Sequence, residues 1–347
     1  MTVIEVNQDD GYASVNVIHI GGLVEQKVAI DGHKFIVYAT DGQYVEPQEV
    51  DILVVPVGAR CEYQYRVYRR PGAYSNRAVQ TLVKLNNPGD WTIRTTNSMP
   101  NQMISGYAVF SYASKENCSP PKNGLPELCG SKTFTSPPSD QPSFTWGGTV
   151  LNNATTVAYF TLKPFPAIAP PQQADHTLIW DVGKPINRVW SLNLDGHPFL
   201  AWREQQTPAI IDPQPFLDAE VAIPLYYGEV IDVVFRIPAG NPTHPFHKHD
   251  AKAFVIGEGP GAFTWSSVAE AQAAVPQYFN LENPALRDTF GTIAAFASPT
   301  WVAIRWKVDS SMPVFFHCHI SYHLAAGMAT VFFEGLERGF AQGPPGA

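Results

Sequence analysis

The chain has 347 residues, of which 45% are hydrophobic and 16% charged, so it is long and apolar enough for two ordinary globular domains. Its 31 prolines and 26 glycines often cluster between apolar runs, which favours many short strands over long helices. A formal net charge of -8 and the lack of an 18-residue apolar stretch argue against partners such as nucleic acid and against a membrane span.

Residues 1–112 are predicted to form a first β-domain. Segments rich in β-branched and aromatic residues alternate there with turn sequences, which indicates a β-sandwich or a Greek-key barrel. The predicted strands span residues 13–20, 26–31, 34–40, 50–69 and 106–114. His19 lies between two isoleucines and is expected to be a core histidine, and Cys61 is expected to be a small buried hydrophobic residue.

Residues 113–173 are rich in Pro, Ser, Gly and Asn and are predicted to be a long connector with polyproline character. Within it, Cys118 and Cys129 lie in one short loop, which indicates a local disulfide in an oxidising compartment. Two reduced thiols are the alternative. The triplet that begins at Asn153 matches the acceptor sequence for N-glycosylation.

Residues 174–336 are predicted to form a second β-domain, followed by a frayed tail at 337–347. The predicted strands span residues 176–182, 188–194, 219–228, 230–238, 252–259, 301–308 and 314–320. A helix is expected in SSVAEAQAAV and the RDTF segment, because Ala, Glu and Gln follow a serine cap in the first of these.

Two histidine motifs, HPFHKH and FFHCHISYHLAAGM, carry the chemistry of the second domain. Successive side chains of a strand point to opposite faces. His317 and His319 are therefore expected to share one face, with Cys318 projecting from the other. His247 and His249 are expected to share a face in the same way.

The two motifs together predict a type-1 copper site. Two imidazoles, a thiolate and a weakly bound axial methionine are the blue-copper ligand set. The second motif has a histidine five residues after its cysteine and a methionine ten residues after it, and the first motif supplies another histidine. The predicted ligands are His244, Cys318, His323 and Met328. Lys248 is expected to project away from its two neighbouring histidines, so it need not repel a metal.

Two other metal sites fit the sequence less well. A structural zinc site prefers several cysteines at CxxC-like spacing, which the chain lacks. A cupin site has a glutamate soon after its HxH pair, whereas Glu258 follows His249 only after nine residues, and Cys318 would have no role there.

The order HPxHxH followed by HCHxxxHxxxxM resembles the multicopper oxidases, and HPFHKHDAKAFVIG is most similar to the laccase-like, ascomycete pigment-type branch. This resemblance implies copper as the cofactor and an all-β fold of two cupredoxin-like Greek-key domains joined by a long Pro-rich linker. It likens residues 1–112 to the middle domain of that family, which binds no copper, so His33 is expected to be structural. It likens residues 174–336 to the third domain.

The same resemblance implies a role for each remaining histidine of the motifs. It puts His247 on type-2 copper and places three others, His249, His317 and His319, on the type-3 pair. A complete trinuclear cluster in this family takes eight histidines, four of them from two HxH pairs in a first domain. The other histidines of this chain are isolated: His19, His33, His176 and His197. The chain is therefore expected to hold only the second and third domains, with half of the oxygen-reducing site.

The resemblance implies a copper-dependent oxidoreductase, a fragment or truncated homologue of a laccase that oxidises phenolic or pigment precursors by one electron. The exposed edge of His323 would receive the electron, and Cys318 would pass it to the flanking histidines. The alternative is a truncated homologue recruited in fungal secondary metabolism as a coupling or cyclisation catalyst or a binding protein, without a complete cluster.

Partners and location follow from the same resemblance. The small-molecule partner is expected to be a phenol. A separate N-terminal domain or a second copy of the chain is expected to cover the face that presents the four remaining histidines. Secretion or a cell-wall location is implied, although the sequence shows no secretory leader at Met1.

Overall fold

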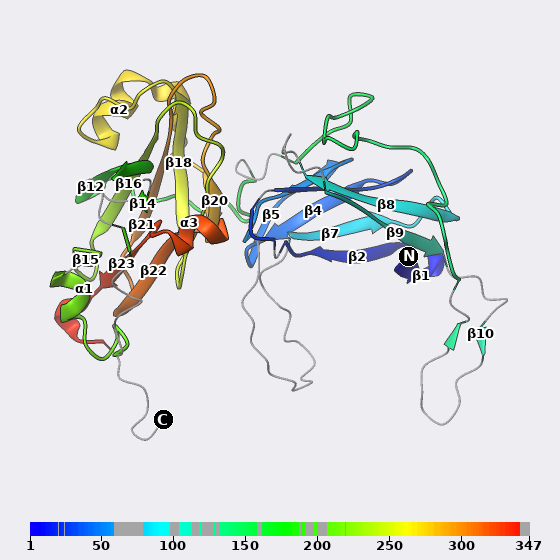
Figure 1. Cartoon of the computed structure of the whole chain (residues 1–347), viewed down its shortest axis with the longest axis horizontal. Helices are drawn as coiled ribbons and strands as arrows, with labels where there is room; N and C mark the ends of the chain where they lie inside the picture. The colour runs from blue at the N-terminus through cyan, green and yellow to red at the C-terminus, as the bar shows by residue number, and fades with distance from the viewer. Residues whose placement is uncertain are drawn as a thin grey trace. The chain divides into compact units, whose positions relative to one another are not determined.

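The computed structural model describes residues 1–19, 21–23, 25–58, 79–97, 104–112, 118–119, 128–129, 132–157, 162–186, 189–191, 198–199, 207–218 and 220–340. The chain divides into two compact units, Met1–Tyr159 and Phe160–Ala347. Figure 1 shows that each unit is built mainly of strands. The predicted all-β class is therefore confirmed. The boundary between the units lies inside the predicted connector.

Two β-sheets form the first unit, with the strand orders β1-β9-β8-β3-β6 and β2-β7-β4-β5. Their strands are β1 Val3–Val6, β2 Tyr12–Val17, β3 Gln26–Ile30, β4 Phe35–Thr40, β5 Gln43–Val50, β6 Leu53–Val55, β7 Val79–Lys84, β8 Asp90–Asn97 and β9 Ser105–Tyr112. A short 3-10 helix, η1, spans Gln8–Asp10. Buried and half-buried side chains alternate along β4 from Phe35 to Val37, as expected for a strand with one face against the core.

The predicted strand segments of the first unit contain β3, β4 and β6 and overlap β2 and β9 except for the first residue of each, while Cys61 and the rest of residues 59–78 lie outside the described residues. His19 is 9% exposed. His33 lies in hydrogen-bonding distance of two groups, with its Nδ1 2.9 Å from the Asp31 carbonyl oxygen and its Nε2 2.8 Å from the Tyr112 hydroxyl. Both histidines are thus parts of the packed interior of this unit.

Part of the predicted connector packs on the first unit. Ser139 Oγ donates a hydrogen bond to Asp31, and Phe144 packs in a buried cluster with Ala29 and Ile52. The short strands β10 (Cys118–Ser119) and β11 (Leu128–Cys129) pair so that the two cysteine backbones lie opposite each other. The disulfide between them stays a prediction.

Two larger sheets form the second unit, with the orders β12-β16-β21-β18-β19 and β15-β23-β22-β17-β20, beside a hairpin of β13 and β14. The strands are β12 His176–Asp181, β13 Gly183–Ile186, β14 Val189–Ser191, β15 Ala222–Leu225, β16 Val230–Ile237, β17 Pro245–Lys248, β18 Ala253–Pro260, β19 Ala285–Arg287, β20 Thr289–Gly291, β21 Thr300–Lys307, β22 Met312–Cys318 and β23 Ala329–Glu334. Both strands that carry the histidine motifs, β17 and β22, belong to the second of these sheets, whereas β16 belongs to the first.

The two sheets of the second unit meet in an aromatic core. Phe235 of β16 stacks on Phe246 of β17, with ring centroids 4.7 Å apart, and on Phe316 of β22 at 5.7 Å. All three side chains are 0% exposed. Burying aromatic rings is the largest favourable contribution such a core can make, so these contacts fix β17 and β22 against the opposite sheet.

Helices are few and short among the described residues. They are α1 Gln214–Asp218, α2 Val268–Ala274 and α3 Ser321–Ala325, with 3-10 helices η5 Pro276–Tyr278 and η6 Leu336–Arg338. The helix predicted in SSVAEAQAAV is confirmed as α2, whose Ser267 side chain accepts a hydrogen bond from the Glu270 backbone. Among the described residues, no helix is long and apolar enough to cross a membrane.

The helical expectation for the RDTF segment is wrong. Arg287 ends β19 and Thr289 begins β20, and both side chains are buried. The two strands pair with β18 and β17 respectively. Edge pairing in two different sheets therefore overrides the local helical tendency of this stretch.

A buried ion pair in the first unit generates a stability prediction. Arg94 donates two hydrogen bonds to Asp31, at 2.8 and 2.9 Å, and the Asp31 side chain is fully buried. Replacing Asp31→Ala leaves the guanidinium with only the exposed Asp140 carboxylate and the Ser139 carbonyl oxygen, and is expected to lower the free energy of unfolding by about 3 kcal/mol in urea titrations. The matched control is Lys34→Met, which breaks a half-exposed pair with Glu49 and should cost less than about 1 kcal/mol. Equal effects of the two substitutions would contradict the role of burial.

Candidate metal centre

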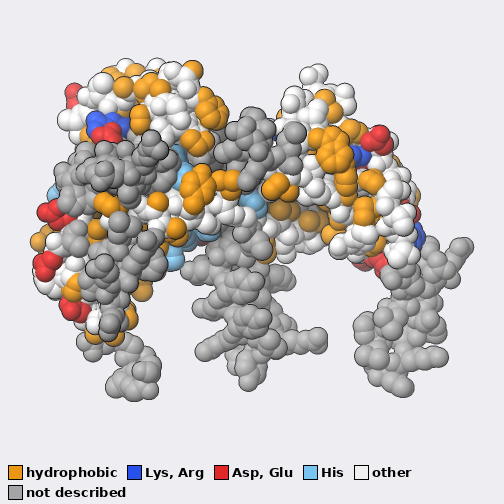
Figure 2. Space-filling model, viewed as in Figure 1, with side chains coloured by type: hydrophobic (Ala, Val, Ile, Leu, Met, Phe, Trp, Pro, Cys, Tyr) orange, Lys and Arg blue, Asp and Glu red, His pale blue; other side chains and the backbone are white. Residues whose placement is uncertain are grey.

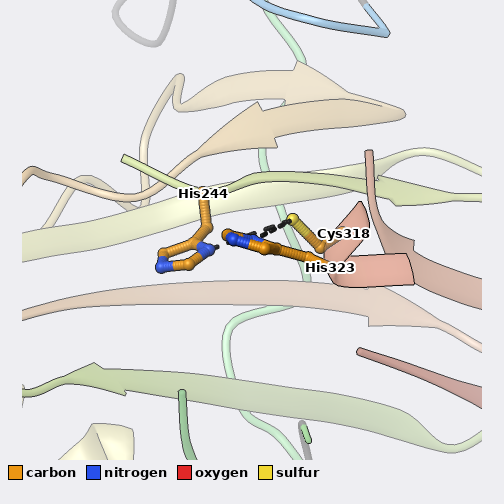
Figure 3. A group of neighbouring side chains, drawn as sticks. All are labelled: His244, Cys318 and His323. Carbon is orange, nitrogen blue, oxygen red and sulfur yellow. Dashed lines mark hydrogen bonds between the residues drawn. The ribbon is translucent and has the colours of Figure 1, made fainter. Parts of the chain in front are cut away.

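Three side chains of the second unit converge on one buried point. Cys318 Sγ lies 3.6 Å from His323 Nδ1 and 3.9 Å from His244 Nδ1. Figure 3 shows the sulfur directed at the two imidazoles, and the three potential ligand atoms lie within 4.8 Å of one another. Cys318 and His244 are 0% exposed, and His323 is 1% exposed. Among the described residues it is the one group of three such side chains whose potential ligand atoms all lie this close together.

The backbone after β22 brings His323 back to Cys318. The single turn of α3 begins with the His323 amide bonded to the Ile320 carbonyl oxygen, and the Met328 amide donates to the His323 carbonyl oxygen at 3.0 Å. The Cys318 amide donates to the Met328 carbonyl oxygen at 3.0 Å. Met328 is 0% exposed, so a thioether sits in the same buried loop as the thiol.

Gly327 is required for this loop. Its φ is +107°, a conformation that favours glycine, and an added Cβ would lie 2.5 Å from Pro198. The Phe199 amide also donates to the Gly327 carbonyl oxygen at 2.9 Å. The chain before β15 therefore packs tightly on the loop that carries the three second-motif ligands.

Burial sets the protonation states of this cluster. It lowers the pKa of His244 to about 4 and raises the pKa of the Cys318 thiol to about 12. Without a metal His244 and Cys318 are therefore neutral at pH 7. Two imidazoles and a thiol beside a buried thioether form a soft donor set, and copper binding would displace the thiol proton. The residues present thus fit a type-1 copper ion.

A second group, the histidine face, comprises His247, His249, His317 and His319. It arises because β17 and β22 pair antiparallel, with His247 directly opposite His317. The rings of His247 and His249 lie 4.8 Å apart, and the Nε2 atoms of His249 and His317 are 3.3 Å apart. His249 and His319 are partly exposed, and histidine atoms reach the surface in the view of Figure 2.

Hydrogen bonds orient the two buried rings of the histidine face. His247 Nδ1 lies 3.0 Å from the Asp288 carbonyl oxygen and 3.1 Å from Thr289 Oγ1, and His317 Nδ1 lies 3.0 Å from the Cys318 carbonyl oxygen. A carbonyl oxygen only accepts, so both rings carry their proton on Nδ1. Each Nε2 is left with a lone pair for a metal.

The two buried rings of the histidine face, His247 and His317, are also held neutral. Burial, followed by the nearby His317, His249 and His319 rings, lowers the pKa of His247 to about 2. Burial lowers the pKa of His317 to about 3. Neutral imidazoles are the form that binds metals, so these two rings are in the ligating form before any ion binds.

One expectation about this centre is wrong. The His323 edge was expected to be exposed, but the ring is 1% exposed because α3 turns it toward Cys318 and His244. The exposed neighbour is Tyr322, which is 52% exposed and whose ring centroid lies 4.4 Å from that of His323.

The structure also places Lys248 of the first motif, Asp250 directly after that motif, and one of the isolated histidines. Lys248 projects away from the histidine face as expected, but it is completely buried beside Glu334, which sequence reasoning missed. Asp250 is exposed. Of the isolated histidines, His176 lies on the surface 3.0 Å from Glu229, and His197 lies outside the described residues.

Comparison with known proteins identifies the family. Two sequence models, both described as multicopper oxidase, match residues 1–114 and 192–337. The chain is 31% identical to the laccase abr2 of Aspergillus fumigatus over 97% of its own length and 52% of that protein. It is 29% identical to the multicopper oxidase elcG of Phaeosphaeria nodorum over 96% of its length and 49% of that protein. The chain thus spans about half the length of these relatives.

Solved structures agree on the fold. The crystal structure of Fet3p, a multicopper oxidase that functions in iron import, aligns with a TM-score of 0.68 at 18% identity over 99% of this chain and 60% of that one. The laccase from Botrytis aclada aligns with a TM-score of 0.67 at 19% identity over 98% and 54%. The predicted pair of cupredoxin-like domains is confirmed by this likeness. The chain belongs to the multicopper oxidase family, whose cofactor is copper.

Proposed function

We propose that the second unit takes single electrons from a phenolic or pigment-precursor donor at a type-1 copper site and delivers them toward the histidine face. The type-1 ligands in this proposal are His244, Cys318, His323 and axial Met328. The observation that carries it is the convergence of one thiol and two imidazoles at 3.6 and 3.9 Å in a dry pocket. Copper bound there would supply a one-electron redox couple.

The chain itself provides the route between the two places. Cys318 faces the interior, while His317 and His319, its covalent neighbours, belong to the histidine face. The Cys318 carbonyl oxygen also orients the His317 ring. An electron arriving at the Cys318 sulfur therefore crosses only a few covalent bonds to reach either imidazole.

Electron entry is proposed to pass by Tyr322. His323 is covered, so a donor in solvent meets first the exposed phenol ring that packs edge-on against it. The contact between the two rings keeps the distance from donor to ligand short. This supports outer-sphere electron transfer from a planar aromatic donor over direct coordination of the donor to the metal.

The histidine face is proposed to be completed by another domain or another chain. It supplies four imidazoles, with His247 proposed as a ligand of type-2 copper and the other three as ligands of the type-3 pair. A complete cluster of this family takes eight. His249 and His319 are partly exposed, which is consistent with a surface that a further ligand-bearing body covers. A separate N-terminal domain or a second copy of this chain are the proposed partners, and the secretory pathway is the proposed location.

Absorption spectroscopy tests the copper site. The copper-loaded chain is expected to show an intense visible band from thiolate-to-copper charge transfer, and Cys318→Ser should abolish it because no thiolate remains. His176→Gln, a surface histidine outside both groups, is the matched control and should leave the band unchanged. Persistence of the band in the serine variant would disprove the assignment of Cys318.

Oxygen consumption tests the incomplete cluster. The copper-loaded chain alone is expected to be reduced by a phenol once, with no steady oxygen uptake, because half of the imidazoles are lacking. An oxygen electrode with the chain at increasing concentration checks this. Sustained reduction of oxygen to water at a concentration where the chain is monomeric would contradict the proposal, whereas uptake that begins only when the chain self-associates would identify a second copy as the partner. Full activity of a chelated, copper-free sample in a coupling or cyclisation assay would instead favour the non-oxidase alternative.

The depressed pKa values predict acid sensitivity of the metal-free chain. As the pH falls below about 6.5, His244, His247 and His317 are protonated in the unfolded chain but stay neutral in the folded chain. The free energy of unfolding therefore decreases. Each histidine contributes a slope of about 1.4 kcal/mol per pH unit, His244 down to pH 4 and the others to lower pH. Urea unfolding at pH 7 and pH 5 measures this slope. His247→Gln should reduce it, and an unchanged stability between the two pH values would contradict the neutral-imidazole assignment.

A further inference from the structure

A buried ion pair lies on the interior side of β17. Lys248 and Glu334 both have 0% exposed side chains, and the ammonium Nζ lies 3.0 Å from Glu334 Oε1. Trp306 Nε1 donates to the same carboxylate oxygen at 2.9 Å, and Ser310 Oγ donates to Oε2 at 2.7 Å. Lys248 Nζ also lies 5.3 Å from the centre of the Trp306 ring. Two opposite charges are thus enclosed by aromatic and polar groups of the core.

The position of Lys248 in its strand is what makes the pair informative. It stands between His247 and His249, on the opposite side of the backbone. Fully buried charges are expensive to desolvate, and a hydrophobic pair of similar size would serve stability as well or better. The best-attested use of such a pair is to select one arrangement of chain segments over others.

The strand β17 needs such a selection. It is four residues long and begins with Pro245, which has no amide proton to donate. A slip by one residue against β22 would turn the histidines inward and Phe246 outward, so the hydrophobic pattern excludes it. A slip by two residues keeps every side chain on its side and moves the histidines by about 6.8 Å along β22. The hydrophobic pattern therefore does not exclude a slip by two residues.

We propose that the Lys248–Glu334 ion pair locks the register of β17 and thereby positions His247 and His249 against His317 and His319. In the observed register Lys248 is opposite Phe316, and Glu334, at the end of β23, is opposite Met312 on the same strand β22. These two positions are four residues apart along β22, a gap that the two long side chains span, so a slip by two residues that moves Lys248 toward Cys318 would separate the ammonium from the carboxylate and leave both charges buried and unpaired. The pair is a positioning device and touches no substrate.

The type-1 ligand next to β17 has a separate anchor. The His244 amide donates to Thr292 Oγ1 at 2.9 Å, and the Thr292 amide donates to the His244 carbonyl oxygen at 3.0 Å. Only Pro245 and Phe246 separate His244 from His247, so a slip of β17 by two residues would also break these bonds. The bonds between His244 and Thr292 therefore act together with the ion pair against that slip.

The test measures register in the metal-free chain, so it does not depend on whether copper binds. The variant is Lys248→Met combined with Glu334→Gln, which removes both charges and keeps an acceptor for Trp306 and Ser310. NMR cross-strand contacts between His247 and His317, and between Thr292 and His244, are compared with those of the parent chain. The expected result is a loss or doubling of both contacts, because His244 and His247 move with the same strand, and a urea midpoint close to that of the parent.

The matched control removes another buried pair of the same unit. Arg305 donates two hydrogen bonds to Asp232 on strands of the other sheet, at 2.6 and 2.8 Å. Asp232→Asn combined with Arg305→Met should leave the contact between His247 and His317 unchanged. If this contact is lost equally in both double variants, the effect is general loosening of the core and the proposal is overturned.

A single, unchanged contact between His247 and His317 in the Lys248→Met, Glu334→Gln chain would also overturn it. If that chain does not fold, the milder variant Glu334→Gln is read with the same contacts. A shifted register there supports the lock, and the parent register there refutes it. Failure of the copper assignment would be seen separately, as a parent chain without the visible band but with an intact contact.

Discussion

The antiparallel pairing of β17 with β22 is the interaction on which both metal-binding groups depend. It places Phe246 opposite Cys318 and His247 opposite His317. Because a strand alternates its side chains, this one register sends the thiol into the core and the neighbouring imidazoles out of it. Two chemically different sites therefore share a single backbone, and the shortest connection between them is the peptide chain itself.

The aromatic core gives this pairing its environment. Phe246 stacks on Phe235, and its ring lies 6.2 Å from that of His244. Exclusion of water around these groups lowers the pKa of His244 and raises the pKa of the Cys318 thiol, so both groups are neutral at pH 7. The same packing that stabilises the unit thus leaves neutral imidazoles available to a metal and makes thiolate formation depend on one.

Much of the fold and the candidate centre could be predicted because ligand spacing is a local property. The five-residue step from Cys318 to His323 and the alternation around Cys318 are visible in the sequence, and His244, Cys318 and His323 do meet in the structure. Met328 was placed with them by spacing, and its backbone is bonded to that of Cys318. Strands such as β8, whose apolar residues are diluted by Thr, Arg and Asn, gave too weak a signal.

Other features depend on tertiary contacts that no local pattern contains. A lysine between two histidines is normally a solvated residue, so its burial against a glutamate 86 positions later could not be anticipated. The burial of His323 depends on how α3 turns, and the strands around Arg287 depend on partners in two sheets. In each case distant segments decide the environment of a residue whose own neighbours indicate something else.

The loop that closes on Gly327 has a consequence for how fast a site of this kind exchanges electrons. Backbone bonds join Cys318 to Met328 and Met328 to His323, and Phe199 ties the same loop from outside. The backbone positions of Cys318, His323 and Met328 are thus fixed by the fold itself. A cage that barely rearranges when the charge at its centre changes demands little reorganisation, and little reorganisation means a low barrier for each oxidation and reduction.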